Sequence, residues 1–253
     1  MALRLVQVNF KAGDDSALGR FWADALGWGV SSEGPGVTNV EPLDFAWPDP
    51  AAVCVDVVTV PDPETVRYRA HLDLNTTSRA HHAELVAHLL QLGATPADLG
   101  KGDTRRDSVG HVAWTVLADP EGNLFRVLGP RSIYRDTGPI AAVVVSCRDP
   151  RAMARFWGGA TDWTLHEVND DSARLRSAKG VGPCLEFHST PPLETEWGRV
   201  HLDLMPYPGD DHSAEVDRLR GLGATDVDLG QGNVPWVCLA DPEGNDFCVL
   251  SPG

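Results

Sequence analysis

The side chains best suited to chemistry occur in a four-residue motif that appears twice. HLDL spans residues 71–74 and again residues 201–204, so a histidine precedes an aspartate by two positions in each. Residues two apart in a β-strand face the same side, so each His–Asp pair shares one face and the leucines take the other. Such a pair is either a hydrogen-bonded feature of a polar sheet face or part of a site that contacts a ligand or a metal.

The C-terminal half holds a second group of candidate ligands. Glu186, His201 and Cys248 supply a carboxylate, an imidazole and a thiol. On neighbouring strands these groups could hold Zn²⁺ or another divalent ion. Strand alternation puts His188 on the face of Glu186, and Asp203 on the face of His201. The alternative is a polar-lined pocket in which Cys248 is simply buried.

Composition narrows the classes of protein and partner. The chain has 253 residues, of which 42% are apolar, so it is long enough for two domains with packed cores. Its formal net charge of −15 repels phosphate backbones and anionic membranes, so we expect neither nucleic acid nor a membrane as partner. No apolar run approaches the roughly 20 residues that span a bilayer. The N-terminal residues lack a signal-peptide pattern, and we expect a cytoplasmic protein.

Internal repetition is the main evidence on organisation. RFW at 20–22 recurs at 155–157, LGAT at 92–95 recurs at 222–225, and LADPEGN at 117–123 recurs at 239–245. The offset between matches only decreases along the chain, which two loop deletions in the second copy explain. The chain is therefore a tandem duplication. The segment GPRSIYRDTG at 129–138 contains Gly, Pro and mixed charge, which is typical of a linker. We predict a first domain over 1–130, a linker over 131–138 and a second domain over 139–253.

The elements that position these residues alternate regularly. Leu18, Phe21, Trp22, Ala25 and Leu26 follow helical spacing, with Asp14 or Asp15 as N-cap and Gly27 beyond the C-terminus. A strand precedes this helix and short strands follow it, and then the order repeats. Each copy therefore contains two β-α-β-β-β rounds, which is an α+β fold.

Two such rounds per copy, with RFW and LGW, HLDL, LGA and the DPEGN turn in this order, resemble the glyoxalase-like domain of the vicinal oxygen chelate superfamily. That superfamily includes glyoxalase I, extradiol dioxygenases and bleomycin-resistance proteins. The resemblance implies half-open curved sheets built from paired modules, four modules in all, whose concave faces hold a small molecule. Clefts form within one copy or between copies in this superfamily, and the sequence leaves both arrangements open.

The resemblance also implies four ligand positions in each copy. In the first copy Gln7 and His71 match the two positions where the family has histidine. Asp56 matches the position of an optional carboxylate, and Arg126 matches the position of the final carboxylate. Arginine has no lone pair to donate and repels a cation, so we expect no metal here. Arg126 is expected to pair with Asp56 or Asp73, or to bind an anionic ligand.

In the second copy the four positions match Ala142, Glu186, His201 and Cys248. The resemblance therefore favours one divalent metal (Zn, Fe, Mn or Ni) in this copy, with Glu186, His201 and Cys248 as ligands and Asp203 nearby. Glu186 and His201 are also the candidate catalytic residues. The missing acidic residue at the fourth position argues against glyoxalase I activity itself.

Trp47 and Trp197 have no counterpart in the other copy, and they are candidates for stacking on a planar ligand. The leading hypothesis is a glyoxalase-like enzyme that acts on a small oxygenated or aromatic molecule, by metal-assisted lyase, isomerase or oxygenase chemistry in the second copy. The alternative is a metal-free, non-catalytic binding protein of the antibiotic-resistance type. We expect either a monomer, as an internal pseudo-dimer, or a homodimer.

Overall fold

The computed structural model describes residues 2–47, 49–63, 69–97, 104–106, 112–189, 200–232 and 234–251. It contains the four predicted β-α-β-β-β modules. The first module comprises β1 (Arg4–Ala12), α1 (Asp15–Leu26), β2 (Gly29–Gly34), β3 (Val37–Glu41) and β4 (Cys54–Thr59). The second comprises β5 (Ala70–Leu74), α2 (Arg79–Gln91), β6 (Thr95–Pro96), β7 (Thr104–Arg106), β8 (Val112–Ala118) and β9 (Leu124–Leu128).

The second copy repeats this order after a short 3₁₀ helix, η2 (Ser132–Tyr134). The third module comprises β10 (Ile140–Cys147), α3 (Pro150–Ala160), β11 (Trp163–Val168), β12 (Ser172–Ser177) and β13 (Cys184–Ser189). The fourth comprises β14 (Val200–Met205), α4 (His212–Leu222), β15 (Thr225–Asp226), β16 (Val237–Ala240) and β17 (Asp246–Val249). In the described residues, no helix is long and apolar enough to cross a membrane.

Local sequence explains why α1 begins and ends where it does. Asp14 is the N-cap, and its side chain accepts a hydrogen bond from the backbone N–H of Ala17 at 2.9 Å. Gly27 follows the helix in the left-handed conformation (φ 65°), which a residue with a Cβ adopts less readily. Both ends match the sequence prediction.

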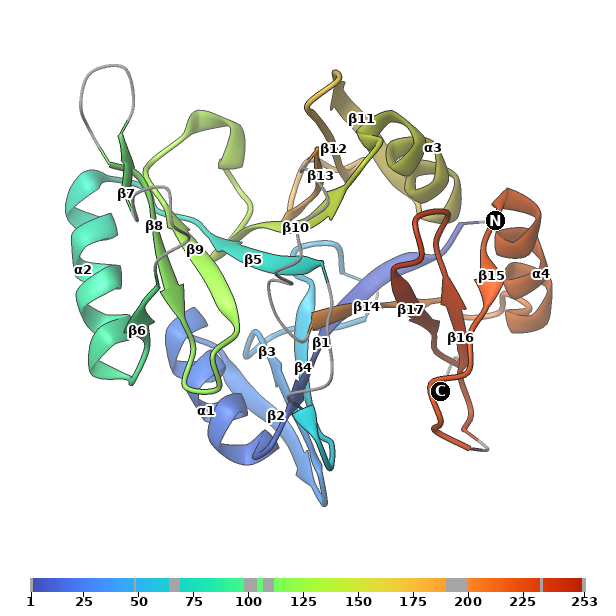
Figure 1. Cartoon of the computed structure of the whole chain (residues 1–253), viewed down its shortest axis with the longest axis horizontal. Helices are drawn as coiled ribbons and strands as arrows, with labels where there is room; N and C mark the ends of the chain where they lie inside the picture. The colour runs from blue at the N-terminus through green and yellow to red at the C-terminus, as the bar shows by residue number, and fades with distance from the viewer. Residues whose placement is uncertain are drawn as a thin grey trace.

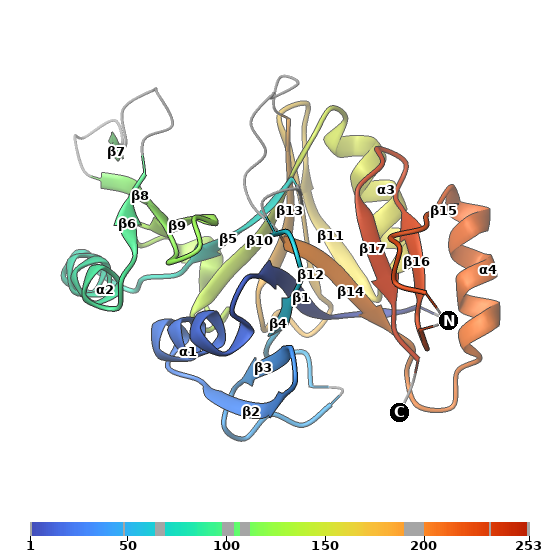
Figure 2. The same ribbon diagram turned by 60° about the horizontal axis from the view of Figure 1, so that its bottom comes forward.

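The two sheets are built across the copies rather than within them. The eight-stranded sheet has the order β15-β16-β17-β14-β1-β4-β3-β2, so the first module pairs with the fourth. The nine-stranded sheet has the order β11-β12-β13-β10-β5-β9-β8-β6, with β7 beside β8, so the second module pairs with the third. In Figures 1 and 2, β14 of the second copy runs beside β1, and β5 of the first copy runs beside β10. The sequence left open whether each cleft forms within one copy or between copies, and in the structure each sheet is shared between the copies.

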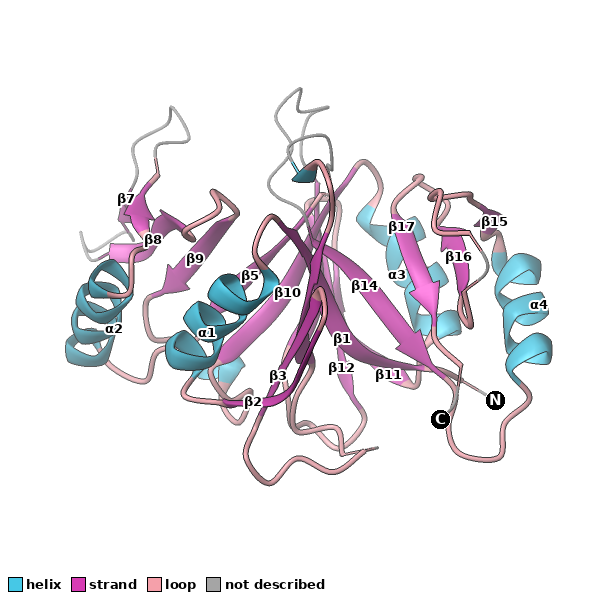
Figure 3. Ribbon diagram, turned by 90° about the horizontal axis from the view of Figure 1, so that it is seen from below, coloured by secondary structure: helices cyan, strands magenta, loops and turns pink. Residues whose placement is uncertain are grey.

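The helices pack mainly against strands of their own copy, whereas the main hydrophobic core is one cluster with buried residues from both copies. Figure 3 shows α1 and α2 on one side of the molecule and α3 and α4 on the other, with the central strands β10, β1 and β14 between the two pairs. In the first copy Trp22 donates from Nε1 to Asp119 (3.3 Å) and its ring lies 5.2 Å from that of Phe125. In the second copy Trp157 makes the same contact to Asp241 (3.3 Å). The RFW and DPEGN motifs, far apart in sequence, therefore hold the two modules of one copy together.

Candidate functional site

Strand β1 presents a polar face at the centre of the eight-stranded sheet. Gln7, Asn9 and Lys11 alternate with Val8 and Phe10, which are buried in the hydrophobic core. The register places Asn9 between His201 on β14 and Asp56 on β4. Side chains from both copies therefore meet on this face.

Asp56 is held by two amides of β1. Its Oδ2 accepts hydrogen bonds from Asn9 Nδ2 at 2.8 Å and from Gln7 Nε2 at 3.3 Å. Its Oδ1 is buried and has no hydrogen-bond partner among the described residues. Burial, followed by the negative charge of Asp203, raises the pKa of Asp56 to about 7. This carboxyl group is thus able to gain or lose a proton near neutral pH.

Three potential metal ligands converge beside Asp56. His201, Asp203 and Cys248 are all buried, and one ligand atom from each lies within 4.8 Å of the others. His201 Nε2 is 2.9 Å from Asp203 Oδ1 and 3.7 Å from Cys248 Sγ. Gln7 Nε2 also donates to Asp203 Oδ2 at 3.0 Å, which links this group to Asp56.

A second thiol adjoins the group. Cys238 on β16 lies directly opposite Cys248 on β17, and their Sγ atoms are 3.5 Å apart. The hydrogen bond between the two lowers the pKa of Cys238 and raises that of Cys248. The site thus holds a thiol pair, an imidazole and a carboxylate.

Lys11 adds a positive charge to the same face. Burial lowers its pKa, whereas the charges of Asp203, Cys248 and Asp56 act in the opposite direction. No carboxylate of the described residues lies within ion-pairing distance of its ammonium group. Lys11 therefore offsets part of the negative charge without engaging any single ligand.

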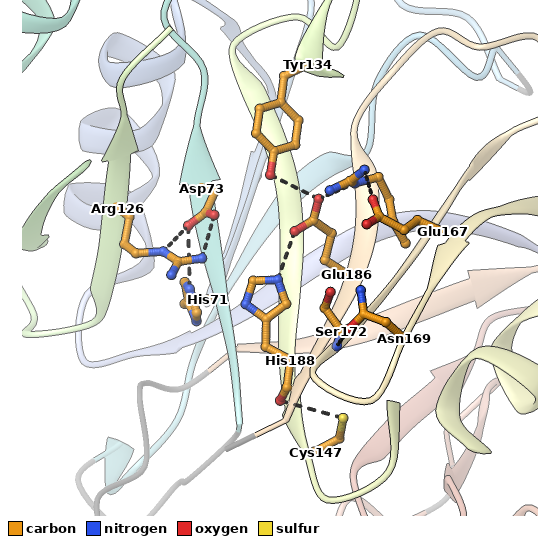
Figure 4. A network of polar contacts seen from close by, with 11 residues as sticks. His71, Asp73, Arg126, Tyr134, Cys147, Glu167, Asn169, Ser172, Glu186 and His188 are labelled. Atoms are coloured by element: carbon orange, nitrogen blue, oxygen red, sulfur yellow. Dashed lines mark hydrogen bonds and ion pairs between the residues drawn. The ribbon is translucent and has the colours of Figure 1, made fainter. Parts of the chain in front are cut away.

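The nine-stranded sheet carries a different polar face, shown in Figure 4. Arg126 on β9 donates from Nε and Nη2 to both carboxylate oxygens of Asp73 on β5, each at 2.6 Å, and His71 Nε2 is 3.5 Å from Asp73. Burial and the neighbouring Arg126 lower the pKa of His71 to about 4. Burial alone would raise the pKa of Asp73, but Arg126 and His71 outweigh it and hold that pKa below its ordinary value. Of the predicted partners for Arg126, the structure selects Asp73.

Glu186 on β13 is equally engaged. Its carboxylate accepts hydrogen bonds from Arg174 Nε (2.7 Å) and from the Tyr134 hydroxyl (3.0 Å), and it lies 2.9 Å from His188 Nε2. Burial acts to raise the pKa of Glu186, but the contacts from His188 and Arg174 lower it. The carboxylate is thus ionised and fully partnered.

The centre strand explains why the two faces differ. Where β1 has Gln7 and Asn9, the equivalent strand β10 has Ala142 and Val144, and Ala142 faces Asp73 as Gln7 faces Asp203. Strand β10 offers no side-chain amide to hold Glu186, and Arg174 and Tyr134 hold it instead. Because Asp73 and Glu186 are each paired with an arginine, the nine-stranded sheet does not fit a divalent ion. The His201, Asp203 and Cys248 group does fit one, since nitrogen, oxygen and sulfur donors of these types are ordinary Zn²⁺ ligands.

The structure corrects the predicted grouping of site residues. Glu186 belongs to the nine-stranded sheet, whereas His201 and Cys248 belong to the eight-stranded sheet, so the three do not form one site. Asp56, assigned by the sequence to the first copy's cleft with His71, instead shares a face with His201. The physical reason is the exchange of modules between copies, which sequence spacing within a copy does not reveal.

The two tryptophan candidates have different outcomes. Trp47 stacks on Tyr207 of the other copy, with ring centroids 5.9 Å apart and an interplanar angle of 29°, so its ring already has a protein partner. Tyr207 in turn accepts a hydrogen bond from Arg4 (2.7 Å). Trp197 lies outside the described residues.

Sequence reasoning missed several residues of these faces. Asn9 and Lys11 follow Gln7 at strand spacing, and this alternation was a usable signal. Cys238 was not identified, because its position opposite Cys248 depends on the register between β16 and β17. Tyr134 lies in the predicted linker, yet it is buried and contacts Glu186.

Comparisons with known proteins agree with this architecture. The family model described as glyoxalase-like domain matches residues 7–128 and again residues 142–250. Glyoxalase I from Zea mays is similar in structure, with a TM-score of 0.67, 14% identity, and coverage of 99% of this chain and 92% of that one. A Bacillus subtilis protein provisionally named a dioxygenase has a TM-score of 0.63 and 11% identity, and covers 100% and 87%.

A bleomycin resistance determinant encoded on transposon Tn5 matches half of the molecule. It covers 51% of this chain and 98% of its own, at 17% identity and a TM-score of 0.35. A search of curated proteins found no significant match. At these identities the similarities to glyoxalase I and to the Bacillus subtilis protein show a shared fold.

Proposed function

Since the chain belongs to the glyoxalase-like domain family, and one of its two polar sheet faces groups three buried side chains of metal-ligand type, we propose that it processes a small oxygenated molecule on the eight-stranded sheet with one divalent metal ion. His201, Asp203 and Cys248 would hold the ion. The active site would therefore lie on a sheet face shared by both copies, and not in a cleft of the second copy alone.

One observation supports this more than any other. Buried imidazole, carboxylate and thiol groups lie within 4.8 Å of one another, next to the Asp56 carboxyl group, which pairs with no arginine of the described residues. Three protein ligands leave a coordination position for a substrate oxygen, as in catalytic zinc sites. When bound, the metal would act as a Lewis acid toward a carbonyl or enediolate oxygen.

Asp56 is the group that would move the proton. Gln7 and Asn9 fix its Oδ2, and its Oδ1 has no hydrogen-bond partner among the described residues. A pKa near 7 lets the carboxylate accept a proton from a carbon or oxygen acid and return it to a neighbouring atom. Lys11, on the same face, would favour negative charge that develops on the substrate.

Binding without catalysis is the second candidate, and the nine-stranded sheet favours it. The carboxylates of Asp73 and Glu186 are each already paired with an arginine. These two arginines also lie over aromatic rings, Arg126 over Trp114 at 5.5 Å and Arg174 over Tyr134 at 5.9 Å. This face is polar and aromatic without a need for metal. It suits recognition of a small molecule more than its turnover.

The decisive experiment is metal content per chain in protein purified without a chelating tag. We expect about one divalent ion per wild-type chain, its loss in His201→Ala, and its retention in His71→Ala. His71 is the matched control because it occupies the equivalent position of the other sheet. Absence of metal from the wild type after incubation with Zn²⁺, Fe²⁺, Mn²⁺ and Ni²⁺, or equal content in both variants, would refute the metal proposal.

A further inference from the structure

Cys238 and Cys248 occupy directly opposed positions on the antiparallel strands β16 and β17. Opposed residues of such a pair have Cα atoms about 4.5 to 5.5 Å apart, which lies within the range of about 4.4 to 6.8 Å found in disulfides. Their Sγ atoms are 3.5 Å apart and share a hydrogen bond. A small rotation of the side chains would bring the sulfur atoms to bonding distance.

The surroundings give the two thiols different access. Cys248 is 3% exposed and lies against His201, whereas Cys238 is partly exposed and also donates to Gln231 Oε1 at 3.3 Å. A small oxidant can therefore reach Cys238 first. The other three cysteines, Cys54, Cys147 and Cys184, are buried on strands β4, β10 and β13.

We propose that Cys238 and Cys248 form a redox-active dithiol that a hydroperoxide converts to a disulfide. The Cys238 sulfur attacks the peroxide O–O bond, which gives a sulfenic acid and, from hydrogen peroxide, one water. The Cys248 sulfur then attacks the sulfenic sulfur, the S–S bond forms, and a second water leaves. Two thiols are oxidised by two electrons while one peroxide is reduced.

The disulfide would also alter the neighbouring site. Cys248 Sγ is 3.7 Å from His201 Nε2, and a sulfur in a disulfide is no longer a thiolate ligand. Oxidation would therefore remove one of three metal ligands and lower the affinity for metal. This consequence, unlike the disulfide itself, rests on the proposed function.

The dithiol is tested on reduced, metal-free full-length protein. Hydrogen peroxide is added stepwise, the reaction is quenched, and free thiols are alkylated under denaturing conditions and counted by intact mass. We expect the count to fall from five to three, a Cys238–Cys248 peptide to appear on digestion, and dithiothreitol to restore five. Cys184→Ser should still form the cross-link, whereas Cys238→Ser should not.

The wild-type digest decides the result even if a variant folds poorly. Over-oxidation of Cys238 to sulfinic acid without the cross-link, or a cross-link between other cysteines, would overturn the proposal. A second measurement compares Zn²⁺ affinity of the reduced and oxidised protein, with at least a tenfold loss expected on oxidation. If neither form binds Zn²⁺ but the cross-link forms, the metal proposal fails while the dithiol stands.

Discussion

Asp56 and Asp73 are both buried aspartates, yet their partners give them opposite acid–base behaviour. Amides surround Asp56 and burial raises its pKa, whereas a bidentate arginine keeps Asp73 ionised. An amide dipole offsets much less of the desolvation of a carboxylate than a guanidinium charge does. The type of partner, more than the depth of burial, therefore separates a proton-transfer group from a structural ion pair.

The raised pKa of Asp56 predicts a pH-dependent stability. Its folded-state value of about 7 exceeds the ordinary 3.8, so the folded protein holds more protons than the unfolded chain between these values. The free energy of unfolding should fall as pH rises through this window. Asp56→Asn should remove this pH dependence. The free energy of unfolding of the variant, relative to that of the wild type, should therefore rise by about 2 to 3 kcal/mol from pH 5 to pH 8. Urea unfolding at both pH values measures it, with the exposed Asp170→Asn as a control variant.

The Arg126–Asp73 pair predicts a large stability loss when only one partner is removed. Arg126→Met leaves the Asp73 carboxylate buried without its cation and should lower the free energy of unfolding by about 3 to 5 kcal/mol. Adding Asp73→Asn should recover part of the loss. Arg151→Met, which breaks an exposed pair with Asp170, should change it by less than about 1 kcal/mol. Equal effects of the two arginine variants would contradict this assignment.

At the scale of the elements, the DPEGN turn does more than reverse the chain. Asp119 Oδ1 accepts from the backbone N–H groups of Glu121 (3.0 Å) and Asn123 (2.9 Å), and its Oδ2 accepts from Trp22. The Glu121 carboxylate accepts from the backbone of Gly13 and Asp14 at 2.9 Å, just before α1. One turn therefore connects the last strand of a copy to its first helix.

Asp119→Ala should accordingly lower the free energy of unfolding much more than a substitution in an ordinary surface turn does. Several donors, among them the buried indole N–H of Trp22, would lose their acceptor, and we expect a loss of about 2 to 4 kcal/mol. Asp241→Ala should behave alike, because it holds Trp157 in the same way. Chemical denaturation of both variants, with the exposed helix residue Asp217→Ala for comparison, checks the expectation. If Asp119→Ala lowered the free energy of unfolding no more than Asp217→Ala does, the turn would not hold the two modules together.

At the scale of the whole molecule, the duplication is completed by pairing between copies. Strand β1 pairs with β14 and β5 pairs with β10, so neither copy alone completes a sheet. The corresponding registers, Gln7 with Asp203 and Ala142 with Asp73, show that the two junctions are equivalent. The chain is thus arranged as a pseudo-symmetric dimer of its own halves.

This arrangement predicts the behaviour of one copy in isolation. Residues 1–130 alone would expose the edges of β1 and β5, with unpaired backbone groups beside apolar side chains. Two such fragments can pair β1 of one with β5 of the other, so we expect a dimer of twice the fragment mass. Light scattering after size-exclusion chromatography measures this. A well-folded monomeric fragment would contradict the expectation.

Local features of this protein were determined by its sequence. The duplication follows from direct comparison of the two halves of the sequence. The four modules, the caps of α1, and the shared face of His201 and Asp203 follow from helical spacing and strand alternation, which are short-range rules. They made the α+β fold and most residues of the polar faces predictable.

Tertiary structure alone decided which of these residues meet. Linear spacing suggested that Glu186 would lie with His201 and Cys248. Strand pairing between the copies instead places Asp56 on the same sheet face as His201, and the β16–β17 register places Cys238 opposite Cys248. Pairing partners are chosen by the burial of whole sheet edges across distant segments, and no local pattern records that choice. For this reason the sequence could name the candidate ligands, whereas the fold had to assemble them into sites.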